Sequence, residues 1–378
     1  MASSELELEK MPYQKFKDSP TIKYYTDWAT FDELLGYMPE GTVGWIDIGT
    51  LKKSPTILLK PDGFEYSGIN DIGVEKFSRN ALKLYDLSEG KVYAKHFLRI
   101  DKYISLLIKE GEKRNVKLAI IPPKKGSSSH HLSIKLERSA SLNLEVIYAP
   151  ISESSLSSFT LEIDGEGENK IKILNLVKAP NNSPFFYETR ILGRGKDDIS
   201  VRTATSGGII HNRADIVILG SMSKANIKAL SLVTNNNRAD FTTNILNDSS
   251  QGIAEILVRG INAGGEIVHR GTLKAETNSI ESENKLRSYL IKTSKNSINH
   301  SVPILEITTN LIKTAEHSTD ISDIPEDILF YLSSRGLKRE EAVFLLTQSM
   351  LIDMVEDLFE NSNEAIEWSN NFLKNIRL

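Results

Sequence analysis

The sequence predicts a mainly β protein: a right-handed parallel β-helix, preceded by an α/β N-terminal region and followed by a helical C-terminal segment. Short stretches that alternate apolar and polar residues recur between residues 116 and 312, for example at 132–136, 143–147 and 159–163. Alternation with a period of two is typical of half-buried strands. Turn-forming Gly, Asn, Ser and Asp separate the stretches, and no strong helical pattern interrupts them. A β-solenoid can extend this far as one unit, because each coil packs only on its neighbours.

The composition is that of a globular chain and excludes several kinds of function. The chain has 378 residues, a net charge of -4 and a charged fraction of 25%, which indicates neither a nucleic-acid surface nor acidic disorder. Residues 1–10 lack the apolar core of a signal peptide, and no apolar run approaches the ~20 residues of a membrane span. We therefore expect a soluble, cytoplasmic protein that binds neither nucleic acid nor membrane. The sequence contains no Cys, which excludes disulfides, thiolate metal sites and cysteine nucleophiles within this chain.

Residues 1–114 form the first predicted unit, a mixed helical region. The apolar spacing of residues 28–35 predicts a helix that ends before Pro39. Residues 74–87, where apolar side chains stand among charges, predict a second helix. Residues 111–114 are charged and turn-like, and we place the end of the unit there.

Residues 115–318 form the second predicted unit, the β-helix core. One internal repeat favours stacked coils: Asn-Arg-Ala-Asp at 212–215 returns at 237–240, an offset of 25 residues, close to one coil of a β-helix. Asn residues at 235–237 and at 278 would suit amide ladders between stacked turns.

Residues 319–378 form the third predicted unit, a helical segment. Pro325 and the acidic residues after it fit the start of a helix, and Gly336 fits its end. A second helix should follow, with an apolar stripe that includes Ala342, Leu345 and Leu346. The residues alone leave two interpretations open: this arm is a cap on the open end of the solenoid, or it is a docking surface for a partner.

Candidate catalytic motifs are weak. Residues 193–196 read Gly-Arg-Gly-Lys, but Asp197 follows where a P-loop has Ser or Thr, so we expect no ATP hydrolysis by this chain. The pair Asp197-Asp198 suggests an alternative function, a β-helix carbohydrate-active enzyme, although suitable basic or aromatic partners do not follow it. The side chains of His130 and His131 would lie on opposite faces of a strand, so the two cannot chelate one metal ion together. We therefore interpret them as a surface pair.

Two other histidines, His300 and His317, stand near the last predicted strands. They are seventeen residues apart, a spacing that could bring them onto neighbouring coils. Neutral imidazole is a suitable iron ligand, whereas an isolated histidine more often has a structural role.

Residues 299–346 contain a run of short motifs in a characteristic order. The motifs are Pro303-Ile304-Leu305-Glu306-Ile307, Glu316-His317, Phe330-Tyr331-Leu332-Ser333-Ser334-Arg335-Gly336-Leu337 and Arg339-Glu340-Glu341-Ala342. Their order and spacing resemble the C-terminal signature of the SufB/SufD family of iron–sulfur cluster assembly proteins. The resemblance extends more loosely over residues 115–360 and is poor in the first 110 residues.

The resemblance implies a non-catalytic subunit of a SUF complex. Its implied partners are a SufC-type ABC ATPase and a SufB-like paralogue or a second copy, paired through the β-helix edge. An iron–sulfur cluster would be held only transiently at the subunit interface, and the chain alone would hold no stable cofactor. Members of the family bind the ATPase through their C-terminal helices, which assigns docking to Phe330, Tyr331, Arg335, Gly336, Ala342, Leu345 and Leu346.

The resemblance also implies a cluster site. His317 matches a histidine implicated in SufD proteins, and Glu316 and His300 are further candidate ligands. The three residues after His317 differ from the Gly-Ala-Thr usual in the family. The SufB cysteine and glutamate would fall at Ser297 and Ser318, so both scaffold ligands are missing and the chain is SufD-like. A homodimeric SufB/SufD-like subunit is the other alternative.

Overall fold

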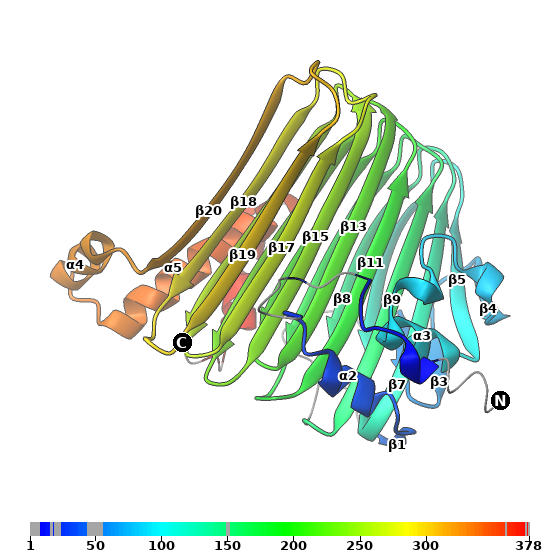
Figure 1. The fold of residues 1–378 in the computed structure, drawn as a ribbon, viewed down its shortest axis with the longest axis horizontal. Coiled ribbons are helices and arrows are strands. Elements are labelled where there is room, and N and C mark those ends of the chain that lie inside the picture. The colour runs from blue at the N-terminus through cyan, green and yellow to red at the C-terminus, as the bar shows by residue number, and fades with distance from the viewer. Residues whose placement is uncertain are drawn as a thin grey trace.

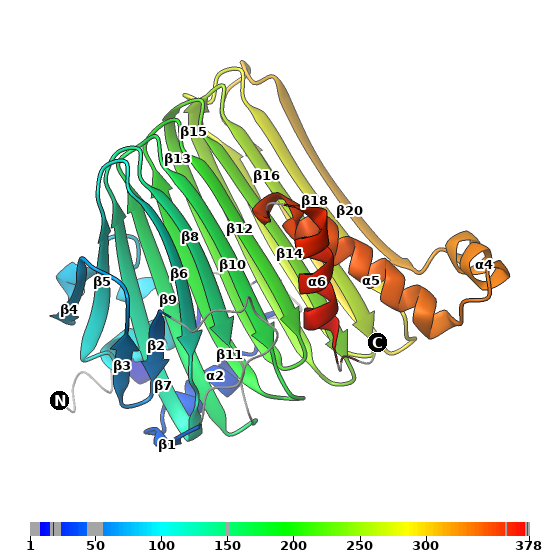
Figure 2. The same cartoon turned by 180° about the vertical axis from the view of Figure 1, so that it is seen from behind.

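The computed structural model describes residues 8–15, 18, 24–43, 56–148, 152–359, 361–374 and 376. Its body consists of two ten-stranded sheets that face each other (Figures 1 and 2). From β5 onward the chain alternates between the sheets, so each coil contributes one strand to each sheet, and consecutive coils pair in parallel. This architecture confirms the predicted parallel β-helix.

The front sheet faces the viewer in Figure 1. Its strands, in spatial order, are β4 (Ile72–Lys76), β5 (Lys102–Ile108), β7 (Pro123–Leu136), β9 (Ser155–Gly165), β11 (Pro184–Gly193), β13 (Ile209–Ser221), β15 (Arg238–Ser250), β17 (Glu266–Ala275) and β19 (Ile298–Ile307), with β1 (Glu40–Thr42) beside β7. The rear sheet faces the viewer in Figure 2. Its strands are β3 (Gly63–Tyr66), β2 (Ile57–Lys60), β6 (Lys113–Ile120), β8 (Ser141–Tyr148), β10 (Lys170–Lys178), β12 (Asp198–Ser206), β14 (Lys224–Thr234), β16 (Ile253–Ala263), β18 (Glu283–Lys292) and β20 (Thr314–Asp323).

The core lies between the sheets and repeats from coil to coil. Alternate side chains of each strand point inward, and equivalent residues stack: Phe159 of β9 lies on Tyr187 of β11, with ring centroids 5.4 Å apart. Between β13 and β15 the coil advances 29 residues, so that His211 pairs with Asp240. The 25-residue repeat at 212–215 and 237–240 is therefore out of register, and its interpretation as the coil period is wrong there. Turn lengths, rather than the strand motif, set the length of each coil.

The N-terminal end of the β-helix is closed. The β2–β3 hairpin and β4 complete the two sheets by antiparallel pairing, and Phe64, Ile69 and Ile72 pack against the core. The helix predicted at 74–87 is wrong. This stretch begins in β4 and continues through the 3-10 helices η1 (Arg79–Ala81) and η2 (Leu87–Glu89). The segment is an irregular loop whose apolar side chains pack around Phe97. The spacing of these side chains along the sequence resembles that of a helix.

Two N-terminal helices cover the outer face of the front sheet (Figure 1). Helix α2 (Trp28–Leu34) confirms the helix predicted at 28–35, and the Asp27 side chain accepts a hydrogen bond from the Thr30 amide at its start. Helix α3 (Lys91–Leu98) packs beside it, and both bury aromatic side chains against Phe186 of β11.

The described part of the C-terminal segment contains three α-helices, of which α5 and α6 lie on the rear sheet (Figure 2). The helical elements are α4 (Glu326–Ser334), α5 (Arg339–Val355), the 3-10 helix η3 (Glu356–Leu358) and α6 (Ser362–Leu373). Helices α5 and α6 bury Leu351, Met354 and Trp368 in a cluster that includes the outward-facing Leu230 and Leu232 of β14. Helix α4 projects past β20 (Figure 1). The interpretation of this arm as a cap on the open end is therefore wrong.

Parallel pairing extends beyond residues 115 and 318. It begins with β5 and β2 and ends with β20, which runs to Asp323. Within β20 only Ala315 and Ile321 are apolar, so the sequence of this strand lacks the alternating pattern of the other strands. A strand with no further coil on it needs few apolar side chains.

Candidate functional site at the last coil

The last coil, formed by β19 and β20, determines where the predicted ligands lie. On β18, Asn284, Leu286, Ser288 and Leu290 are buried and point inward. These four residues pair with Ala315, His317, Thr319 and Ile321 of β20. His317 therefore faces the interior side of the sheet, yet it is exposed because it belongs to the terminal coil. An imidazole at this position can reach a molecule that approaches the end of the β-helix.

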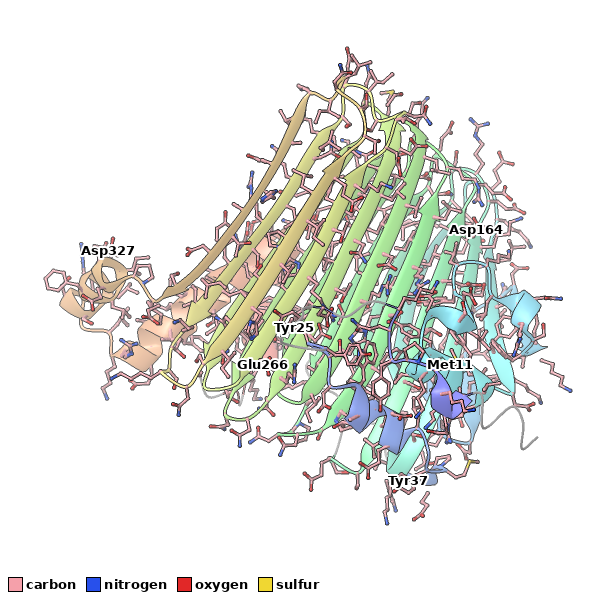
Figure 3. The ribbon with its side chains drawn as sticks, in the orientation of Figure 1. Met11, Tyr25, Tyr37, Asp164, Glu266 and Asp327 are labelled. Carbon is pink, nitrogen blue, oxygen red and sulfur yellow. The ribbon has the colours of Figure 1, made fainter. Side chains whose placement is uncertain are left out.

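His300 lies elsewhere. It pairs with Val268 on β17 and points to the outer side of the front sheet. Its Nε2 lies 3.8 Å from Oε1 of Glu266, and its ring centroid lies 5.0 Å from that of Tyr25 (Figure 3). His300 and His317 thus stand on different sheets and opposite sheet faces, and the structure does not bring these two candidates together.

Glu316 also points away from His317. It lies on the outer face of the rear sheet, where Arg287 donates a 2.8 Å hydrogen bond to it and Lys285 lies 3.9 Å away. The hydrogen bond from Arg287 holds the pKa of Glu316 below its usual value. Among the described residues, no three His, Asp or Glu side chains gather closely enough to hold a metal ion. Of the three candidates, His317 alone faces the interior of the last coil.

Polar side chains border the interior at this end. The Ser301 and Thr319 hydroxyls are 3.2 Å apart and link the front and rear sheets two residues beyond His317. Ser297, at the position implied for a scaffold cysteine, belongs to a turn. Its hydroxyl donates to the Asn262 carbonyl at 2.7 Å and accepts from the Gly264 amide at 3.0 Å. Ser297 therefore has a structural role.

The same end carries two strand edges and exposed apolar side chains. β19 ends the front sheet and β20 ends the rear sheet in the described part of the chain. Edge strands present backbone N–H and C=O groups that can pair with another chain. The exposed large apolar side chains here are Ile298, Ile304, Ile307, Leu311 and Ile321. The apolar core residues of the other coils are buried, whereas these five side chains are exposed. An exposed apolar patch of this kind is suited to association with another chain.

A second apolar surface lies on α4 and α5. Phe330 is 77% exposed and Tyr331 58% exposed, and Arg335 lies over the Tyr331 ring at 5.4 Å. Helix α4 has no buried residue and ends at Ser334, two residues before Gly336, whose φ of +89° favours glycine. A groove of about 410 Å³ between the helices is lined by Asp327, Ile328, Tyr331, Leu332, Leu345 and Leu346.

The predicted docking residues therefore divide into two groups. Phe330, Tyr331 and Leu345 are exposed, whereas Ala342 is fully buried and Leu346 is half-buried against the cluster on the rear sheet. Ala342 positions α5, and the exposed residues of α4 are free for contact with a partner.

A row of basic residues on the rear sheet anchors the C-terminal arm, and the sequence analysis missed it. Arg202 of β12 is 1% exposed and donates to Oδ2 of Asp357 at 2.6 Å. Lys228 of β14 donates to the Asp353 carbonyl at 3.1 Å, and Arg259 of β16 pairs with the Asp353 carboxylate. Cations near the C-terminal end of α5 also complement its helix dipole. In the sequence, outward-facing basic residues at similar places on successive predicted strands are the pattern that could have indicated this anchoring row.

The other sequence motifs have structural roles. Asp197 is buried and accepts hydrogen bonds from the Gly195 amide at 2.8 Å and the Asn169 amide at 2.9 Å. Burial raises its pKa. The surface interpretation of His130-His131 is wrong. His131 is 1% exposed beneath the segment that contains Phe77. His130 pairs with the core residue Phe159 and points into the β-helix, where burial lowers its pKa to about 4.

Comparisons with known proteins agree with the fold and with the C-terminal motifs. The family model for the SUF system FeS cluster assembly SufBD core domain matches residues 120–350. An iron–sulfur cluster assembly SufBD family protein of Galdieria sulphuraria is 24% identical over 155 residues, 41% of this chain and 70% of that protein. A Synechocystis protein of the same description is 25% identical over 155 residues. One from Archaeoglobus fulgidus is 29% identical over 113 residues.

These matches are partial. The aligned part spans 32% of the Synechocystis protein and 30% of the Archaeoglobus protein, and 41% and 30% of this chain respectively. In the described part of the chain, no helix combines the length and the apolar character needed to cross a bilayer.

Proposed function

Because the chain belongs to the SufBD family of SUF iron–sulfur cluster assembly proteins, we propose that it is a non-catalytic, SufD-like subunit of an assembly complex. The observation that carries the proposal is the exposed terminal coil, with two strand edges, exposed Ile side chains and an inward-facing His317. The chain has no Cys, and soft iron and sulfide favour thiolates. The thiolate ligands must therefore come from a partner, a SufB-like paralogue, which joins this end.

Pairing at β19 and β20 is the first part of the proposal. Joining a partner's edges to these two strands would satisfy their free backbone groups and bury the exposed apolar side chains. His317 would then lie at the junction and could contribute an imidazole ligand to the cluster under assembly. A second copy of this chain could pair in the same way, but such a homodimer would contain no thiolate.

Substitutions on the two edges test this pairing. Ile304→Lys and Ile321→Lys together introduce charge on β19 and β20, where the side chains are 42% and 41% exposed. We expect the affinity for the SufB-like paralogue to fall by about tenfold or more, the scale of a lost interface anchor. The matched control is Ile280→Lys, which is 42% exposed in the turn before β18.

Co-purification and analytical ultracentrifugation measure the outcome. Unchanged affinity in the double variant would contradict pairing at this end. Formation of a homodimer that the double variant abolishes would favour the second-copy alternative over a paralogue.

Docking of a SufC-type ABC ATPase on α4 and α5 is the second part of the proposal. The exposed Phe330 and Tyr331, beside the groove that Leu345 lines, support it. The basic row beneath α5 fixes this arm to the β-helix, so that force or motion at α4 would be transmitted to the rear sheet. ATP hydrolysis in the partner could thereby act on the assembly interface.

A further inference from the structure

The outer face of the front sheet contains a buried histidine between two carboxylates. His211 points outward from β13 and is 2% exposed, because the N-terminal strap, residues 24–35, lies over it. Its Nδ1 is 3.0 Å from Oδ2 of Asp240 on β15, and its Nε2 is 3.1 Å from Oε1 of Glu188 on β11. Both carboxylates are essentially fully buried. A neutral imidazole carries one N–H, so it can donate to only one of them.

The strap is attached to the same carboxylates. The Thr26 hydroxyl donates to Oδ2 of Asp240, the oxygen that His211 contacts. On the aromatic side, Trp28 and Phe31 lie against the imidazole with ring centroids 5.1 and 6.4 Å away, and Phe186 of the sheet stacks on it at 5.1 Å. The charge state of His211 therefore bears directly on the contacts that hold α2 to the sheet.

The other charged groups of this network are five carboxylates and three guanidinium groups, an excess of negative charge that favours a positive imidazole. Arg270 of β17 pairs with Asp240 and Asp18, and Arg190 of β11 lies 3.6 Å from Glu188. The Tyr93 hydroxyl of α3 donates to Glu188. The further ionic groups of this network are Glu89, which pairs with Arg190, and Arg213 and Asp215 on β13, which pair with each other. Without the proton on His211, Glu188 and Asp240 would face a ring that can donate to one of them.

We propose that His211 is a proton-dependent switch that holds the N-terminal strap on the front sheet when it is an imidazolium and releases the strap when it loses its proton. Release would expose Phe186 and the row of polar side chains that the strap covers, without altering the coils beneath. The strap also touches the last coil, because the Tyr25 ring lies 5.0 Å from that of His300 on β19, but neither His317 on β20 nor the C-terminal arm takes part in the switch.

The direction of the pH dependence follows from the titration of the closed form. Burial lowers the pKa of His211, but the hydrogen bonds to Asp240 and Glu188 outweigh burial and hold that pKa above its usual value. A released histidine would titrate near the ordinary value of about 6.5. Above that pH, release of the strap also releases a proton, so the opening constant rises by up to about tenfold per pH unit until the closed-form pKa is passed.

Hydrogen exchange of the full chain tests the switch between pH 6 and 9, with rates corrected for intrinsic exchange. We expect protection of residues 24–35 to fall as pH rises, while protection of the β9 and β11 core remains constant. His211→Phe keeps the aromatic contacts but carries no proton, so its strap should be open at every pH. His317→Ala, a change remote from the strap, should behave like the unmodified chain.

A second measurement keeps the test decisive if His211→Phe does not fold. The imidazole resonances of His211 in the unmodified chain report its titration directly. Titration above about 6.5 together with pH-dependent strap protection supports the proposal. Any of three results would overturn the proposal. His211 could titrate at or below that value, the protection of the strap could fail to vary with pH, or protection could be lost in the strap and the core together.

Discussion

Removal of the Asp357 carboxylate should loosen the C-terminal arm by a predictable amount. Arg202 is 1% exposed and donates to Asp357 at 2.6 Å, so Asp357→Ala leaves a buried guanidinium without its ionic partner. Breaking a fully buried ion pair costs about 3–5 kcal/mol. Two features reduce that cost here: Asp357 is 45% exposed, and Arg202 also donates to Oδ1 of Asn226 at 2.7 Å. We therefore expect the free energy of unfolding to fall by about 1–2 kcal/mol.

Arg202→Met provides the informative comparison. It removes the buried charge together with its partner interaction and retains an apolar side chain of similar length, so it should cost less than Asp357→Ala. Urea denaturation gives the stability, and hydrogen exchange of residues 339–373 shows whether the loss is local to the arm. Asp323→Ala is the control, because that side chain is 85% exposed and 3.9 Å from Lys292. A larger loss in Arg202→Met than in Asp357→Ala would refute the reasoning.

Three further predictions concern assembly. First, the chain purified alone should not retain an iron–sulfur cluster after anaerobic reconstitution and gel filtration, because it has no Cys; a persistent cluster absorption band would contradict this. Second, Phe330→Ser with Tyr331→Ser should abolish binding of the SufC-type ATPase in a pull-down and leave the melting temperature unchanged, because α4 has no buried residue; retained binding would remove the docking role. Third, His317→Ala should change stability by less than about 0.5 kcal/mol, as expected at an exposed position, and should lower cluster loading in the intact complex; a normal yield would exclude His317 as a ligand.

The β-helix could be predicted from the sequence because its signal is local. Residues 159–163 alternate between core and outer face in the sequence as they do in β9, and the same pattern returns in each coil. The inward position of His317 needs more than the local pattern. It depends on the register that pairs His317 with Leu286 of β18, which no residue near His317 specifies.

The missed features depend on contacts between distant parts of the chain. Arg202 is covered by the C-terminal arm, where it pairs with Asp357, 155 residues later, so its burial could not be predicted from β12 alone. His131 is buried because the segment around Phe77 and Phe97 folds over the front sheet. The network at His211 draws on four strands and the N-terminal segment, and its members look like ordinary surface charges in the sequence.

The two ends of the β-helix are unequal in the described part of the chain, and this difference limits the size of the assembly that the proposed edge pairing could form. At the N-terminal end the sheets finish in β3 and β4, which have four and five residues and carry charged side chains such as Glu65 and Lys76. Short, charged edges are poor templates for another chain. At the other end, β19 and β20 are ten residues each. If only the end formed by β19 and β20 can pair with another chain, each molecule joins one other molecule through its strand edges. Such pairing yields a closed dimer and cannot propagate into a fibre. A β-solenoid with two such ends would polymerise.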